Sequence, residues 1–111
     1  MLDATSRQLE SYLTFVSERQ RLVASNIANA DTPGYKTKDL DFDAALQNSL
    51  APAEPQEVSG LITKNDGNNV DIDREARLLA ENTLRFNIAS NLLHSKIKVM
   101  RMAIEGNSTA S

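Results

Sequence analysis

Two long stretches of the sequence carry apolar residues in an alternating four- and three-residue spacing, and this repeat constrains the fold more than any other feature. One stretch lies within residues 5–30, and the other lies within residues 72–105, where the repeat persists for more than four heptads. Such spacing is typical of helices that pack lengthwise against another helix. We therefore predict two long helices with these bounds.

Residues at the ends of both stretches fit helix termini. Thr5 and Gln8 have the spacing of a capping box, and Asp71 is a natural N-cap for the second helix. The first helix must end before Pro33, because the residue that precedes a proline is disfavoured in the helical conformation. Gly106 suits the position just beyond the end of the second helix.

The lengths of the two helices predict an elongated molecule. At 1.5 Å per residue they would measure ~39 and ~50 Å, whereas a compact domain of this size is ~35 Å across. We predict one all-α-dominated domain over residues 1–111, with the terminal helices packed as a coiled-coil-like pair around an irregular segment with room for some β-structure. Its parts are residues 1–30 (N-terminal helix), 31–70 (turn and middle segment), 71–105 (C-terminal helix) and 106–111 (tail).

The middle segment differs in composition from the two stretches around it. It contains all three prolines and three of the four glycines, which interrupt regular structure. A short helical turn is predicted over residues 42–50 and an extended piece over residues 58–63. Asp66-Gly67-Asn68-Asn69 is a strong turn signal. A segment of this length inside a small domain favours a binding or packing role.

Composition excludes several partners. The formal net charge is −3 and the isoelectric point is about 5.1, so the chain lacks the basic surface that nucleic acids require. No apolar run approaches the ~20 residues of a spanning helix, and we expect no direct membrane insertion. We also expect no cleaved secretory signal, because the first residues have neither a basic nor an apolar region. The absence of cysteine excludes disulfides and thiolate metal sites.

Catalytic and metal-binding patterns are missing from the sequence. His94 is the single histidine, so it has no companion for a transition-metal site. Asp39, Asp41 and Asp43 surround one phenylalanine, and we interpret them as a solvated loop. No nucleophile is accompanied by a partner base, and no glycine loop could bind a phosphate. We expect neither enzymatic activity nor a cofactor or metal.

The turn before the second helix has a superficial likeness to a calcium-binding loop. When Gly67 is aligned with the invariant glycine of an EF-hand, Ile62 falls at the first ligand position. An isoleucine side chain cannot coordinate calcium, so the pattern fails. A turn followed by a helix N-terminus explains the same residues better.

The stretch SNIANADTPGY at the end of the first helix combines two features. Asn26 and Asn29 are three residues apart, so their amides reach a similar part of the helix surface beside Ile27. Pro33 and Gly34 fit the central positions of a type II turn, after which Tyr35 can return its ring to the helix end. These residues fit both a well-terminated helix and a surface for another chain.

Two segments resemble one known family. SNIANADTPGYK and the later NDGNNVDIDREARLLAENTLRFN are similar to the terminal signatures of flagellar rod and hook proteins, the second to a proximal rod member. The resemblance implies a non-enzymatic structural subunit of the bacterial flagellar basal body. It also implies export from the cytoplasm through the flagellar type III apparatus and helical polymerisation in the periplasm into a torque-transmitting shaft.

The partners implied by this resemblance are copies of the chain itself, other rod proteins and the membrane-ring/rod adaptor protein. The alternative is a soluble helical-hairpin adaptor, which would form a stable coiled-coil dimer. The stripes and the resemblance together give a set of candidate interface residues: Val23, Asn26, Ile27, Asn29, Ala30, Asp31, Thr32, Pro33, Gly34, Tyr35, Asn69, Val70, Leu79, Phe86, Leu93, Ile97 and Met100.

Overall fold

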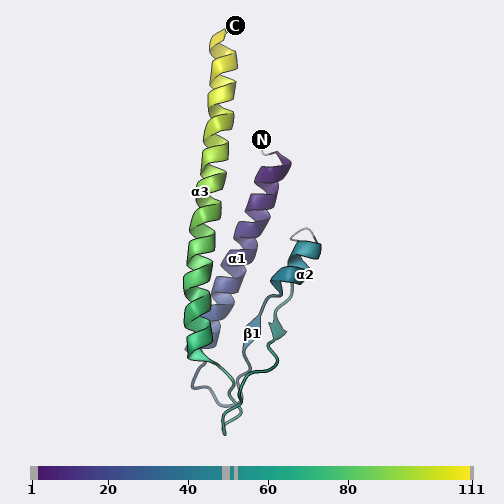
Figure 1. Cartoon of the computed structure of the whole chain (residues 1–111), viewed down its shortest axis with the longest axis vertical. Helices are drawn as coiled ribbons and strands as arrows, with labels where there is room; N and C mark the ends of the chain where they lie inside the picture. Colours follow the sequence, from purple (N-terminus) through teal and green to yellow (C-terminus); the bar gives the residue numbers. More distant parts are fainter. Residues whose placement is uncertain (1–2, 49–50, 52, 111) are drawn as a thin grey trace.

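The molecule is an elongated helical hairpin with a small lobe beside it (Figure 1). A computed structural model describes residues 3–48, 51 and 53–110. The principal-axis extents are 72 × 24 × 16 Å and the radius of gyration is 18.8 Å. A compact domain of this length would have a radius of gyration near ~13 Å. The predicted elongated shape is therefore confirmed.

Helices account for most of the described residues, as the predicted fold class requires. Two long helices contact each other, and a short helix and a two-stranded sheet lie in the middle of the chain. The elements in chain order are α1 (Ala4–Ala28), β1 (Lys38–Asp39), α2 (Phe42–Gln47), β2 (Gln56–Glu57) and α3 (Ile72–Ala110).

Helix α1 begins one residue before the predicted start, and a different residue caps it. The Asp3 carboxylate accepts a hydrogen bond from the backbone N–H of Ser6 at 2.8 Å. The predicted capping box of Thr5 and Gln8 is wrong, because both residues already lie within the helix. A hydrogen bond from Lys96, together with the Ser6 N–H, lowers the pKa of Asp3 to about 2.

Helix α3 begins where predicted but continues further. Asp71 accepts from the backbone N–H of Arg74 at 3.2 Å, which confirms it as the N-cap. The predicted end before Gly106 is wrong, since the helix runs through this residue to Ala110. A glycine inside a helix costs only about 1 kcal/mol relative to alanine, and no proline follows to stop the helix. No helix of the described residues is long and apolar enough to cross a membrane.

The two long helices run antiparallel. Lys96 of α3 pairs with Asp3 at the start of α1 at 2.8 Å, while Asn26 near the end of α1 reaches Glu75 in the first turn of α3. Beyond Lys96, α3 continues well past the N-terminal end of α1 (Figure 1). The hairpin therefore has both helices at the end that carries the turn, which we call the tip, and α3 alone at the opposite end.

The middle segment packs on the outer side of α1. Strands β1 and β2 pair antiparallel, with Lys38 opposite Glu57. The predicted extended piece over residues 58–63 is wrong in position, because the strand that pairs with β1 lies just before it. The predicted helical turn is confirmed as α2, and residues 49–50 of that prediction lie outside the described residues.

An apolar core joins the middle segment to the hairpin. Phe42 of α2 makes edge contacts with Tyr12 and Phe15 of α1, with ring centroids 5.9 and 5.4 Å apart. The guanidinium of Arg85 on α3 lies 5.6 Å from the centroid of the same ring. One phenylalanine thus fixes the lobe against both helices. The buried apolar cluster beneath it consists of Phe15, Val16, Leu22, Leu40 and Ala45.

Candidate functional site

The Pro-Gly turn after α1 has the geometry that the sequence predicts. The backbone N–H of Tyr35 donates to the carbonyl of Thr32 at 3.2 Å, which closes a four-residue turn around Pro33 and Gly34. Gly34 has φ +77°, the left-handed region that a type II turn requires at its third residue. Asn29 caps the helix before the turn, since its backbone N–H donates to Ser25 and Asn26 carbonyls.

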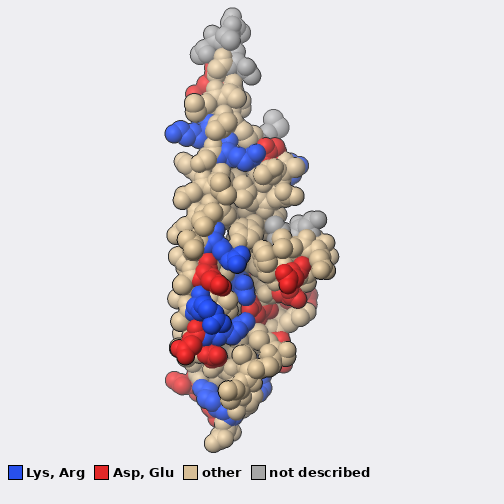
Figure 2. Space-filling model, in the orientation of Figure 1, with Lys and Arg blue, Asp and Glu red and all other residues tan. Residues whose placement is uncertain are grey.

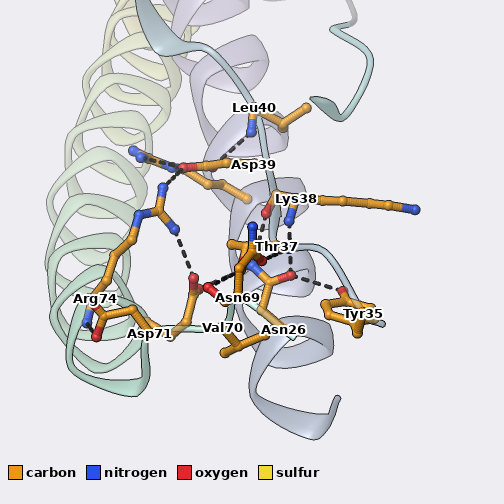
Figure 3. Close-up of polar contacts among 12 residues, drawn as sticks. Asn26, Tyr35, Thr37, Lys38, Asp39, Leu40, Asn69, Val70, Asp71 and Arg74 are labelled. Atoms are coloured by element: carbon orange, nitrogen blue, oxygen red, sulfur yellow. Dashed lines mark hydrogen bonds and ion pairs between the residues drawn. The ribbon is translucent and has the colours of Figure 1, made fainter. Parts of the chain in front are cut away.

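Asn26 is the centre of a buried polar junction (Figure 3). Its side chain has no solvent exposure and makes four hydrogen bonds, so the amide is fully paired. Its Nδ2 donates to the Lys38 carbonyl at 2.9 Å and to Glu75 Oε2 at 3.2 Å. Its Oδ1 accepts from the Tyr35 hydroxyl at 2.9 Å and the Lys38 N–H at 3.2 Å. One amide therefore joins α1, the turn, β1 and α3.

Two asparagines that precede α3, Asn68 and Asn69, hydrogen-bond to the backbone in and just after the Pro-Gly turn. Asn68 Nδ2 donates to the carbonyls of Asn29 and Thr32 at 2.9 and 2.8 Å. Asn69 Oδ1 accepts from the buried backbone N–H of Thr37 at 2.7 Å. The two sequence signatures are thus one structural unit, because Asn68 gives the Asn29 and Thr32 carbonyls a second hydrogen bond and Asn69 pairs the N–H of Thr37 just after the SNIANADTPGY segment.

The two turns also meet backbone to backbone. The N–H of Gly34 donates to the Asp66 carbonyl at 2.9 Å. A Cβ placed on Gly67 would lie 3.3 Å from the Cα of Gly34, closer than most such contacts. Gly67 has φ +87°, a conformation that favours glycine, and the nearby Gly34 backbone leaves little room for a side chain.

A charged cluster lies beside this junction. Asp39 accepts a paired hydrogen bond from Arg19 at 2.9 and 3.0 Å and another from Arg74 at 2.6 Å. Arg74 also donates to Glu75 Oε1 at 2.7 Å, and Glu75 is fully buried. Burial raises the pKa of Asp39, but the hydrogen bond and charge of Arg19, the backbone hydrogen bond of Leu40 and the hydrogen bond of Arg74 outweigh it and hold the pKa below its usual value.

The charged cluster corrects one expectation and adds residues that sequence reasoning missed. Asp39 is ion-paired and mostly buried, so its interpretation as part of a solvated loop is wrong. The sequence does not indicate that the cluster includes Arg19, Arg74 and Glu75, because charged residues in a helix usually face solvent. Asp41 accepts from the N–H of Ala44 as the N-cap of α2.

The face of α3 that packs against α1 is not the predicted apolar stripe. Its buried row consists of Glu75, Leu78, Asn82 and Ala89. The N-terminal half of the predicted apolar repeat consists of Ile72, Ala76, Leu79, Thr83 and Phe86. Ala76, Leu79 and Thr83 each lie one position after a buried residue, and this half is exposed: Leu79 is 40% accessible. The physical reason is that Glu75 and Asn82 are polar residues buried by tertiary contacts, which an apolar pattern cannot reveal.

The candidate interface residues therefore fall into three groups. Val23, Asn26, Asn69 and Val70 are buried inside the chain, and Asn29, Ala30, Tyr35, Leu93, Ile97 and Met100 are partly buried. The exposed members are Ile27, Asp31, Thr32, Pro33, Gly34, Leu79 and Phe86. Of these exposed residues, Ile27 lies at the end of α1, Asp31, Thr32, Pro33 and Gly34 lie in the turn after it, and Leu79 and Phe86 lie on α3.

Charged side chains gather unevenly on the molecule. Figure 2 shows acidic and basic residues concentrated around the lower middle of the hairpin and wide uncharged areas elsewhere on the same face. Among the described residues, no group of three or more His, Cys, Asp or Glu side chains could hold a metal ion. The site consists of a buried polar junction and, on α3, exposed large apolar side chains of a kind that marks surfaces for binding protein.

Comparisons with known proteins agree with this description. Residues 16–36, which end α1 and form the turn, match the family model described as "Flagella basal body rod protein". The flagellar basal body rod protein FlgB of Salmonella typhimurium is 31% identical, over 95% of this chain and 96% of the relative. That of Escherichia coli is 29% identical over 94% and 95%, and that of Borrelia hermsii is 30% identical over 85% and 90%. The chain thus belongs to the FlgB family of flagellar basal body rod proteins, which are structural and not enzymatic.

Proposed function

We propose that this rod protein polymerises helically through its two terminal helices and so forms the proximal rod that transmits torque. The observation that supports the proposal is the row of large apolar side chains left exposed along the hairpin. Ile72, Leu79 and Phe86 are 49%, 40% and 39% accessible and recur at helical spacing on one side of α3. A repeated apolar row of this kind marks a surface that another chain covers.

In this proposal, the chain has three kinds of partner. Copies of itself extend the polymer, while other rod proteins and the membrane-ring/rod adaptor protein bind at its two ends. The flagellar type III export apparatus carries the chain from the cytoplasm. In this arrangement each contact joins two different surfaces of the protomer, because such contacts generate open helical assemblies when they do not close into a ring.

The test compares export with assembly. Ile27→Asp and Leu79→Asp each place a carboxylate on an exposed apolar position, so the isolated chain should fold normally while the covered interface would contain a buried, unpaired charge. We expect both variants to be secreted at normal levels but to be missing from isolated basal bodies, with loss of motility. Arg77→Ala, exposed on the same helix, is the matched control and should assemble normally.

Two outcomes would overturn the proposal. Normal rod yield from either aspartate variant would show that this row is not the assembly surface. A purified wild-type chain that forms a stable dimer, and that is missing from basal bodies in its host, would instead favour the hairpin adaptor.

A further inference from the structure

The turn before α3 contains a pair of residues that can react with each other. Asp66 is exposed and directly precedes Gly67. In an aspartyl-glycine pair, the backbone nitrogen of the glycine can attack the carboxyl carbon of the aspartate, because the glycine has no Cβ to obstruct the approach. A nitrogen–carbon bond forms, and the amide hydrogen leaves with the carboxyl oxygen as water. A second water then opens the resulting succinimide at either carbonyl, which gives aspartate or isoaspartate without a change of mass.

The fold restrains both of the groups that would react. The N–H of Gly67 donates to the Lys64 carbonyl at 2.9 Å and closes a four-residue turn. Asp66 Oδ1 accepts a hydrogen bond from the N–H of Asn68 at 3.0 Å, which holds the carboxylate in place. A succinimide has no hydrogen on the glycine nitrogen, so it cannot form while the bond to Lys64 exists. Ring closure therefore requires this turn to open.

The Pro-Gly turn after α1 keeps the second turn closed. The Asp66 carbonyl accepts from the N–H of Gly34 at 2.9 Å, and the Gly67 carbonyl accepts from Lys36 Nζ at 2.7 Å. Asn68 Nδ2 also donates to the carbonyls at the end of α1 and in the Pro-Gly turn. Opening therefore removes hydrogen bonds from both turns at once, and each bond lost from a partly buried group is costly.

We propose that Asp66 is a site of isoaspartate formation that the folded tip suppresses, and that the modification, once made, prevents the tip from closing. The reaction should proceed only from the open state of the tip, so its rate in the folded chain follows the population of that state. Isoaspartate would therefore accumulate in chains whose two turns have not met. This inference is independent of the proposed function.

The covalent change explains why the tip could not close again. In isoaspartate, the main chain runs through the former side chain of Asp66, which adds one methylene before Gly67. The carbonyl that accepted from Gly34 becomes part of a carboxylate outside the main chain. The four-residue turn is then one carbon longer, so its closing bond to Lys64 and the contact with Gly34 cannot both be made.

Peptide mapping of the purified full chain tests the proposal. The chain is kept at neutral pH in buffer or in urea, and isoaspartate is quantified with an isoaspartyl-specific carboxyl methyltransferase. We expect isoaspartate at Asp66 in urea, and formation at least tenfold slower in buffer. Asp43 is the internal control, because it is exposed and precedes Ala44, whose Cβ obstructs the attack. It should remain aspartate in both conditions.

A variant that leaves the reacting pair unchanged separates the effect of the fold from that of the local sequence. Asn68→Ala removes the hydrogen bonds to the Asn29 and Thr32 carbonyls. We expect it to raise the rate in buffer at least threefold and to leave the rate in urea unchanged. If circular dichroism shows that this variant is unfolded, Lys36→Met is used instead, because it removes only the side-chain bond to the Gly67 carbonyl.

Three results would overturn the proposal. They are equal rates in buffer and urea, no isoaspartate at Asp66 in urea, or a folded variant whose rate in buffer equals that of the wild-type chain. The final measurement is hydrogen exchange of the isoaspartyl chain after it is returned from urea to buffer. The Gly34 amide, which donates to the Asp66 carbonyl in the unmodified chain, should exchange at least tenfold faster. Unchanged exchange would show that the modification does not keep the tip open.

Discussion

Asn26 in α1 donates its side-chain N–H to the carboxylate of Glu75 in α3 at 3.2 Å, and both side chains are fully buried. The two residues are 49 positions apart in the sequence. This bond ties the end of the first helix to the start of the second, so the helices can splay apart at the tip only if buried polar groups lose their partners. We therefore expect the end of the hairpin that carries the turn to resist opening.

Replacing Asn26 should destabilise the fold strongly. Asn26→Ala leaves the Tyr35 hydroxyl, the Lys38 backbone and Glu75 without this partner. We expect the free energy of unfolding to fall by at least about 3 kcal/mol, because each buried group left unpaired costs about 1–3 kcal/mol. Urea unfolding followed by circular dichroism measures the change. Asn91→Ala, exposed on α3, should shift it by less than about 0.5 kcal/mol; equal effects would contradict the role of the junction.

Arg74 should not be replaceable by lysine. Its guanidinium contacts Asp39 and Glu75 through different nitrogens, which a single ammonium cannot reproduce. Arg74→Lys is expected to cost about 1–3 kcal/mol of unfolding free energy, since Glu75 stays buried with a poorer partner. Arg77→Lys is the control, because Arg77 is exposed on the same helix. Unchanged urea midpoints in both variants would show that the paired geometry is unimportant.

The stability of the chain should depend on pH through Asp39. The pKa of Asp39 is lowered in the folded chain, so its contribution to stability is complete above the unfolded value near 3.8. That contribution is lost as pH falls below 3.8 and through the lower folded pKa. We expect the urea midpoint to fall at acidic pH in the wild-type chain. Asp39→Asn should be less stable at pH 7 and should show a shallower acid dependence; an unchanged slope would contradict the prediction.

Two glycines allow the cost of a left-handed backbone to be measured separately from the cost of a steric clash. Gly60 and Gly67 both have positive φ, +82° and +87°, but only at Gly67 would a Cβ meet another backbone, that of Gly34. Alanine should cost about 1–2 kcal/mol at either position from the left-handed conformation. Gly67→Ala should additionally push the two turns apart and lower the melting temperature by about 4 °C more than Gly60→Ala. Identical melting temperatures would show that the turns do not press on each other.

The sequence by itself determined the local structure of this protein. The apolar repeat located both long helices, Asp71 marked the start of α3, and Pro33 with Gly34 defined the turn, whose φ and closing hydrogen bond agree with the prediction. These features depend on residues within one or two turns of each other, so short-range sterics and hydrogen bonding are sufficient to fix them.

Only the tertiary structure decided which surfaces are buried. The ion pairs of Asp39 join it to residues 20 and 35 positions away, and no local pattern distinguishes such a carboxylate from a solvated one. No local pattern reveals the burial of Glu75 and Asn82 either. Because these two residues face the inside of the hairpin, the apolar row through Leu79 and Phe86 is exposed. Burial of a polar side chain depends on whether a partner from elsewhere in the chain pairs it, and that partner exists only once the hairpin has formed.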